Sequence, residues 1–222
     1  MEKLETIGII GTGNYGIAIG KRLLKFGCFR VVFGSRNPNK EYLKECLTST
    51  DQFTEFEVTS IKEAWDKSQK VVFFAVSATE SVYESVINEI FKNKTMNEKI
   101  IVDVSNLTDN NYISGSKLSN AEKLQNLIQA KIKAYNQKDL KLSVVKGFNL
   151  INAYSMSANE IKGNIETIPI AGDDFESKEY LAKLCNIIGY QINDIGGLKK
   201  SLELEISNRK TFVDWYFFKF DF

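Results

Sequence analysis

Histidine is absent from all 222 residues of the chain. Its absence excludes dehydrogenases that use a histidine base, histidine-ligated haem and ordinary histidine-based metal sites, because histidine is the usual side chain for each of these tasks. Any reaction that this protein catalyses must therefore use another proton donor, or it must need none.

An excess of charge of either sign is also missing. The chain has 29 basic and 28 acidic residues and a net charge of +1, so no overall field attracts nucleic acid or an anionic membrane. Its three cysteines, Cys28, Cys46 and Cys185, are scattered, which predicts a reducing compartment rather than disulfides or a zinc site. The longest wholly apolar run, residues 71–76, is too short to cross a bilayer, and no signal peptide is expected. These observations predict a soluble, cytoplasmic chain.

The chain does have a regular alternation of short apolar runs and helical patterns. Strands are expected at residues 6–10, 30–34, 56–58, 70–76, 99–105, 141–148, 167–172 and 190–197. Helices are expected from about residue 14 to 26, after Pro38, and after capping boxes at 60–63, 77–80 and 119–122. Such alternation predicts an α/β fold with a Rossmann-like, doubly wound and mostly parallel sheet in a single domain. We assign residues 1–208 to this domain and residues 209–222 to a C-terminal tail.

A glycine fingerprint lies between the first strand and the first helix. The sequence GTGNYG supplies Gly11, Thr12, Gly13, Asn14, Tyr15 and Gly16. In this context Gly11 makes the tight turn, Gly13 lets the backbone approach a pyrophosphate, and Gly16 allows close packing of helix and strand. The helix N-terminus then offers N–H groups to the pyrophosphate. A glycine-rich turn without a ligand is the alternative.

The end of the second strand indicates which dinucleotide is bound. NAD-binding folds keep an acidic residue there for the ribose 2′-hydroxyl, whereas an arginine accommodates a 2′-phosphate. Here Ser35 and Arg36 occupy that place, with Asn37 and Lys40 as candidates to assist them, and a guanidinium suits phosphate geometry. The sequence therefore predicts NADPH as the cofactor. A solvated surface role for Arg36 is the alternative.

Further candidate residues follow the carboxyl ends of later strands, where ligands of such folds bind. They are Val76, Ser77, Ser105, Asn106, Lys146 and Asn149. Ser77 is equally suited to cap a helix, and Asn106 is equally suited to form an Asx turn.

The tail is unusually aromatic, with seven aromatic side chains in residues 212–222. It either packs back on the core or docks on a membrane or partner surface, because aromatic side chains suit both roles.

Five segments together resemble the oxidoreductase domain of the STEAP metalloreductases (six-transmembrane epithelial antigen of prostate), which is related to archaeal F420H2:NADP oxidoreductases. The segments are GTGNYG (11–16), VVFGSRNP (31–38), VDVSN (102–106), VKGFNLINA (145–153) and GGLKKSLELE (196–205).

The resemblance implies that NADPH passes a hydride to a flavin, with FAD, another flavin or F420 as the acceptor. In this family the electrons then cross the membrane through a haem domain to reduce iron or copper. Hydride transfer between nicotinamide and flavin needs alignment rather than an acid–base residue, which agrees with the missing histidine. Tyr154 falls where the family places an aromatic residue near the flavin, and core packing is its alternative role. The family's six membrane helices are absent from this sequence.

Other functions fit the same residues. One is a small-molecule NADP-dependent dehydrogenase or imine reductase, with Lys146 as the acid–base group and Asn149 orienting it. Another is a non-catalytic NADPH-sensing module that uses the tail as its contact surface. Expected partners are NADPH and a flavin, with a membrane-embedded haem domain or the cytosolic face of a membrane as candidates for the tail. A homo-oligomer is compatible with the sequence, and no nucleic-acid partner is expected.

Overall fold

A computed structural model describes residues 4–26, 29–39, 56–92, 96–107, 117–157 and 166–207. Lys40, the helix expected after Pro38 and the aromatic tail lie outside these residues. Most strands appear where the apolar runs predict them. They are β1 (Glu5–Ile10), β2 (Phe29–Ser35), β3 (Phe56–Ser60), β4 (Val71–Phe74), β5 (Lys99–Asp103), β6 (Leu142–Lys146), β7 (Glu166–Gly172) and β8 (Tyr190–Asp194).

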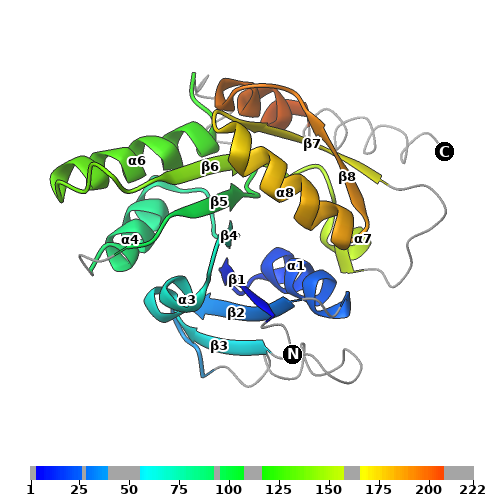
Figure 1. Ribbon diagram of the computed structural model, residues 1–222, viewed down its shortest axis with the longest axis horizontal. Coiled ribbons are helices and arrows are strands. Elements are labelled where there is room, and N and C mark those ends of the chain that lie inside the picture. The colour runs from blue at the N-terminus through cyan, green and yellow to red at the C-terminus, as the bar shows by residue number, and fades with distance from the viewer. Residues whose placement is uncertain are drawn as a thin grey trace, which may run out of the picture.

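The strands form one eight-stranded sheet with the order β3-β2-β1-β4-β5-β6-β7-β8 (Figure 1). All pairs are parallel except β6 with β7, which is antiparallel. The strand order reverses between β1 and β4, and this switch point is where ligands bind in open α/β sheets. The prediction of a doubly wound, mostly parallel sheet is therefore confirmed.

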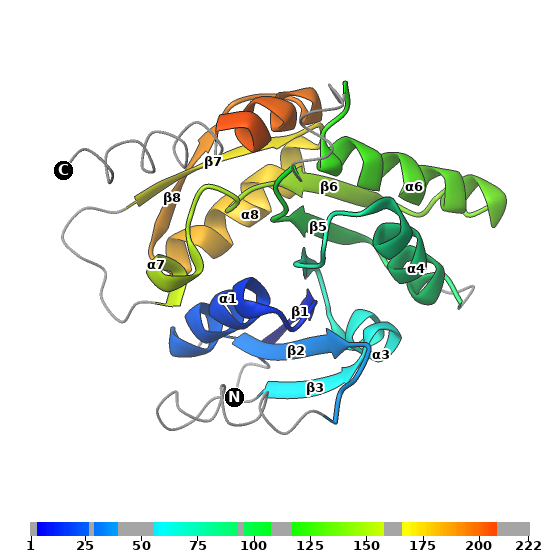
Figure 2. The ribbon, with the colours of Figure 1, turned by 180° about the vertical axis from the view of Figure 1, so that it is seen from behind.

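Helices cover both faces of the sheet. Their bounds are α1 (Asn14–Lys25), α3 (Ile61–Lys67), α4 (Glu80–Ile90), α6 (Asn120–Ala134), α7 (Ala153–Ser157), α8 (Phe175–Ile187) and the 3-10 helix η1 (Leu198–Lys200), followed by helical residues 201–207. Helices α1, α7 and α8 lie on one face and α3, α4 and α6 on the other, as Figures 1 and 2 show from opposite sides. Each face has its own apolar core cluster. The central strand β4 is buried along its whole length, as its continuous apolar sequence predicts for a strand covered on both faces.

Helix starts follow their capping residues in two of the three predicted cases. Ser119 forms a reciprocal capping box with Glu122 at the start of α6, and the Ser60 side chain accepts a hydrogen bond from the backbone of Glu63 at the start of α3. The box expected at residues 77–80 is wrong, because α4 begins at Glu80 with Thr79 as its N-cap and without a side-chain cap. Ser77 therefore precedes the helix rather than capping it.

Candidate functional site: the carboxyl edge of the sheet

The glycine loop joins β1 to α1 at the switch point of the sheet. Gly11 has a φ of 117°, in the region that favours glycine. A Cβ at this position would lie 2.2 Å from the carbonyl oxygen of Ala75, at the end of β4. At Gly16 a Cβ would lie 2.3 Å from the Gly11 carbonyl oxygen. Gly11 therefore lets the loop approach the end of β4, and Gly16 lets α1 approach the loop. Both are the roles that the fingerprint predicts for these glycines.

Gly13 differs from these two glycines. It is the N-cap of α1, it is exposed, and a Cβ there would meet no atom within 4 Å. Neither its φ of −75° nor the surrounding protein requires glycine. The open space lies in front of the backbone N–H groups of the first turn of α1, where a pyrophosphate binds in such folds. Asn14 is also exposed there.

The end of β2 lies beside this loop. Ser35 is buried, and its Oγ lies 3.4 Å from the Oγ1 atom of Thr12. The backbone N–H of Asn37 donates to the same Ser35 oxygen at 3.1 Å. Ser35 thus shapes the turn, while the side chains of Arg36 and Asn37 are exposed. The turn presents the arginine next to the glycine loop, as required for contact with a 2′-phosphate.

The ends of β5 and β6 are joined by a pair of amides. The Asn149 side chain donates from Nδ2 to the Asn106 Oδ1 atom at 2.9 Å, and the Asn106 side chain donates to the Asn149 carbonyl oxygen at 3.2 Å. These two hydrogen bonds link the segment after β5 to the segment after β6. Nearby, Val76 is partly buried and Ser77 is exposed after β4.

Lys146 lies beneath this edge and has no exposed surface. Its Nζ atom lies 2.8 Å from Asp103 Oδ2 and 2.9 Å from Glu205 Oε1, and it donates to the carbonyl oxygen of Ser105. A lysine enclosed in this way presents no surface to a ligand, which argues against the predicted contact of its side chain with the cofactor and against the alternative acid–base role. The sequence pattern could not show this, because both carboxylates come from distant segments.

Three aromatic residues, Tyr15, Phe148 and Tyr154, complete the edge on the side of α1. The Tyr15 hydroxyl donates to the carbonyl oxygen of Phe148, and burial raises the pKa of Tyr15, so the hydroxyl remains protonated at neutral pH. Phe148 is buried with a φ of 65°. Tyr154, in α7, is 86% exposed, which excludes the alternative that it packs in the core.

Some residues of this edge were not identified from the sequence. They are Asp103, Glu205 and Tyr83. All three are buried, Asp103 and Glu205 pair with Lys146, and Tyr83 donates to Asp103 and Ser105. Only the segment 196–205 gave any indication of Glu205, through the family resemblance, and nothing marked Tyr83.

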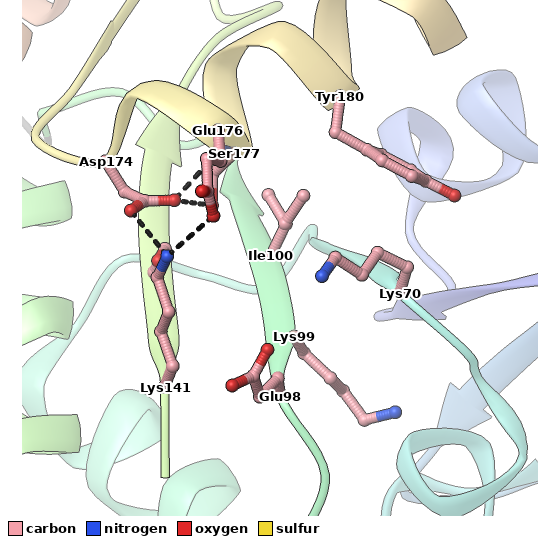
Figure 3. Close-up of a pocket in the computed structure, with 10 residues that line it drawn as sticks. Lys70, Glu98, Lys99, Ile100, Lys141, Asp174, Glu176, Ser177 and Tyr180 are labelled. Atoms are coloured by element: carbon pink, nitrogen blue, oxygen red, sulfur yellow. Dashed lines mark hydrogen bonds and ion pairs between the residues drawn. The ribbon is translucent and has the colours of Figure 1, made fainter. Parts of the chain in front are cut away.

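A separate pocket lies at the opposite, amino end of the sheet (Figure 3). Its volume is about 120 Å³, and it is lined mainly by the starts of β5, β6 and α8. Figure 3 shows the Lys141 amine directed at Asp174 and Glu176, and its distances to their carboxylates are 2.8 and 3.2 Å. Burial lowers the pKa of nearby Lys99 to about 8. This pocket is small and lies away from the switch point, so it is not the dinucleotide site.

The fold and the carboxyl edge together have the arrangement of Rossmann-type dinucleotide-binding folds. They supply the reversal of strand order, the open space at Gly13 and the exposed Arg36 at the end of β2.

Comparisons with known proteins narrow this class. Residues 6–107, which hold β1 to β5 and the whole glycine loop, match the family described as NADP oxidoreductase, coenzyme F420-dependent. The match covers slightly less than half of the chain. No curated protein matches the chain significantly.

Solved structures resemble the chain over most of its length. A candidate F420-dependent NADP reductase from Arthrobacter sp. FB24 has 19% identity and a TM-score of 0.73, covering 95% of this chain and 92% of that one. A hypothetical protein from Sinorhizobium meliloti has 21% identity and a TM-score of 0.67, with 88% and 86% covered. An imine reductase from Bacillus cereus BAG3X2 has 13% identity and a TM-score of 0.65, with 96% and 63% covered. At these identities the structures establish the fold, and with the family match they support an NADP-dependent oxidoreductase.

The expected likeness to F420-dependent NADP oxidoreductases is thus confirmed for the nucleotide-binding segment, whereas the STEAP-specific part stays a prediction. Within the described residues, no helix combines the length and the apolar character needed to span a membrane.

Proposed function

We propose that this protein transfers a hydride from NADPH to a flavin-type acceptor, either FAD or the deazaflavin F420. The observation that carries the proposal is the chemistry of the edge where the nicotinamide would lie. Residues 75–79, 104–107 and 147–151, which directly follow β4, β5 and β6, contain no ionisable side chain. A site of this composition can align two ring systems, but it offers no obvious proton donor or acceptor of its own.

NADPH binding is proposed through the residues of the first half of the sheet. The backbone N–H groups at the start of α1 would hold the pyrophosphate, with Gly13 leaving the space for it. The exposed guanidinium of Arg36 would bind the 2′-phosphate, supported by the turn that Ser35 and Asn37 form. When bound, NADPH supplies the hydride, and the protein's part is to orient the nicotinamide ring and exclude water.

The exposed ring of Tyr154 is proposed as a surface for the acceptor. It projects from α7, which lies beside α1 at the carboxyl edge (Figure 2). Aromatic rings stack on planar ligands at low entropic cost because they have few rotatable bonds. A STEAP-like role would add a membrane partner that accepts electrons from the flavin at the cytosolic face. The tail at 212–222, proposed for that contact, lies outside the described residues.

An imine reductase or dehydrogenase that uses Lys146 is less well supported. The similarity to an imine reductase extends to 63% of that protein, and here the lysine is enclosed between two buried carboxylates. A sensing module remains an outcome of the test below.

The test is an anaerobic reaction of the purified chain with NADPH, carried out with FAD, with F420 and without an acceptor, and repeated with NADH. We expect acceptor bleaching and loss of nicotinamide absorbance together, with NADPH preferred over NADH. Binding of NADPH without reduction of either acceptor would contradict the proposed hydride transfer and favour a sensor.

A further inference from the structure

A fully buried cluster of charges lies directly beneath the proposed nicotinamide site. Asp103 at the end of β5, Lys146 at the end of β6 and Glu205 in the helical segment 201–207 have no exposed side-chain surface. The lysine ammonium has three N–H donors. Its nearest acceptors are Asp103 Oδ2 at 2.8 Å, Glu205 Oε1 at 2.9 Å and the carbonyl oxygen of Ser105, and the Ser105 hydroxyl oxygen lies farther away at 3.3 Å.

The third of these contacts reaches the edge of the site. The Ser105 carbonyl oxygen belongs to the peptide that links Ser105 to Asn106, so Lys146 fixes the orientation of that peptide. Ser105 is held further by its hydroxyl, which donates to Asp103 Oδ2 at 3.0 Å. Asn106 then pairs with Asn149 across the ends of β5 and β6. The ammonium thus sets the position of the turn at Ser105 and Asn106, which directly follows β5 at the carboxyl edge of the sheet.

Glu205 connects this turn to two further elements. Its carboxylate accepts hydrogen bonds from the backbone N–H of Asn120 at 3.0 and 3.1 Å, at the first residue of α6. The adjacent carbonyl oxygen of Leu204 accepts from Asn149 Nδ2 at 3.1 Å. Figure 2 shows this segment lying next to the start of α6. The N-terminal end of the α6 dipole favours the negative charge of the carboxylate, whereas burial raises the pKa of Glu205.

The half of the sheet above this cluster is the one that would receive the nicotinamide. A dinucleotide lies across the switch point with one nucleotide over each half of the sheet. Arg36, at the end of β2, assigns the 2′-phosphate and its adenosine to the first half. The nicotinamide nucleotide then lies over the ends of β4, β5 and β6, where the turn at Ser105 and Asn106 is found.

We propose that Glu205 is a positioning residue, which holds Lys146 and thereby fixes the Ser105–Asn106 turn against which the nicotinamide half of the dinucleotide docks. Lys146 transmits this effect and touches no ligand. The inference rests on the proposed binding of NADPH at this edge. It gives the C-terminal segment a part in cofactor placement, although that segment supplies no side chain to the cofactor.

The test compares two ligands in the Glu205→Gln variant of the full chain. NADPH reports both halves of the site, whereas 2′-phospho-ADP-ribose lacks the nicotinamide and reports the first half only. Glutamine keeps the side-chain length and one oxygen acceptor but removes the charge. The matched control is Glu203→Gln, because Glu203 lies in the same segment, is exposed and pairs only with the nearby surface residue Lys200 among the contacts described there.

We expect the Kd for 2′-phospho-ADP-ribose to be unchanged in Glu205→Gln and the Kd for NADPH to rise about three- to tenfold, the loss expected for one misplaced hydrogen-bonding turn. With a reducible acceptor, kcat should fall about 10- to 100-fold, because hydride transfer is sensitive to small misplacements. Glu203→Gln should behave as the wild type in every measurement. If Glu205→Gln does not fold, Glu205→Asp makes the same comparison, since it keeps the charge but shortens its reach.

Equal weakening of both ligands, or wild-type affinity for both, would overturn the inference. The first result would show a general structural role, and the second would show no role in placement. If the wild type binds NADPH but reduces neither acceptor, the proposed hydride transfer fails, while the ratio of the two Kd values still decides the role of Glu205. If the wild type binds neither ligand, both proposals fail.

Discussion

The hydroxyl of Tyr15 donates a hydrogen bond to the carbonyl oxygen of Phe148, and this contact joins the glycine loop to the turn after β6. The two residues belong to opposite halves of the sheet, on either side of the switch point. Phe148 has a positive φ of 65°, a conformation that costs about 1–3 kcal/mol and persists only where its surroundings enforce it. Tyr15 therefore helps to hold the strained turn that carries Asn149.

We expect Tyr15→Phe to lower the free energy of unfolding by about 1 kcal/mol, because a buried hydrogen bond is lost while the ring is kept. The loss stays small because the Phe148 carbonyl oxygen also accepts from the backbone of Ile151 at 3.1 Å. Urea unfolding measures the difference. Tyr154→Phe is the control, since its side chain is exposed and its stability should not change. Equal stability of Tyr15→Phe and the wild type would argue against the role assigned to this contact.

The exposed position of Arg36 predicts that it matters for binding and not for folding. Arg36→Glu should weaken NADPH binding by about 1.5–3 kcal/mol, because a charged hydrogen bond to the 2′-phosphate is replaced by repulsion. NADH, which lacks that phosphate, should bind the variant no more weakly than the wild type. Isothermal titration with both nucleotides measures this difference, and thermal unfolding should be unchanged. Arg30→Glu, an exposed residue at the other end of β2, controls for the reversal of charge. An unaltered NADPH affinity in Arg36→Glu would refute the assignment of the 2′-phosphate.

Two glycines of the fingerprint should respond in opposite ways to alanine. Gly13→Ala should lose less than about 1 kcal/mol of stability, because alanine is a poorer N-cap residue than glycine but its methyl group meets no atom within 4 Å. It should lose NADPH affinity by filling the space for the pyrophosphate. Gly11→Ala should be destabilised by more than about 1 kcal/mol, since its φ is positive and the methyl group would overlap the Ala75 carbonyl oxygen. Thermal unfolding and NADPH titration of both variants measure the contrast. Full NADPH affinity in a folded Gly13→Ala variant would place the pyrophosphate elsewhere.

Asp174 should make stability depend on pH in the acidic range. The Lys141 ammonium, together with hydrogen bonds from Ser177, lowers the pKa of Asp174 to about 2 from 3.8. A depressed pKa means that the folded state binds fewer protons than the unfolded state, so this stabilisation is present above about pH 4 and is lost as the pH falls toward 2. Asp174→Ala should cost about 1 kcal/mol at neutral pH, as for other N-caps, and the difference from the wild type should shrink on acidification.

Thermal unfolding at several pH values between about 2 and 7 measures this effect. Glu176→Ala is the matched control, because Glu176 contacts the same lysine but is 84% exposed. It should cost less than about 0.5 kcal/mol, as is usual for surface ion pairs. A cost for Asp174→Ala that stays constant with pH would contradict the proposed titration.

Much of the fold could be predicted from local pattern. Continuous apolar runs mark the strands β4 and β5. Capping residues mark the starts of two helices, Ser60 for α3 and Ser119 for α6. Each of these signals depends on only a few neighbouring residues. The start of α4 was misplaced because Ser77 and Glu80 have the spacing of a capping box, whereas the chain continues without regular structure through Thr79. The antiparallel pairing of β7 with β6 also had no local indication. The apolar pattern of a buried strand is the same whether it runs parallel or antiparallel to its neighbour.

The sequence by itself determined the absence of histidine, the glycine fingerprint and the arginine after β2 on which the proposed 2′-phosphate contact rests. The two motifs can be recognised in the sequence because their residues are adjacent or separated by a short, fixed spacing. Only the tertiary structure decided the surroundings of Lys146. It stands at the end of a strand, where a ligand contact is expected, yet Asp103 and Glu205 enclose it from segments that are far away in the chain. Burial and charge pairing depend on which distant segments meet, and in this protein they enclose a lysine whose position in the sequence predicts a contact with the cofactor.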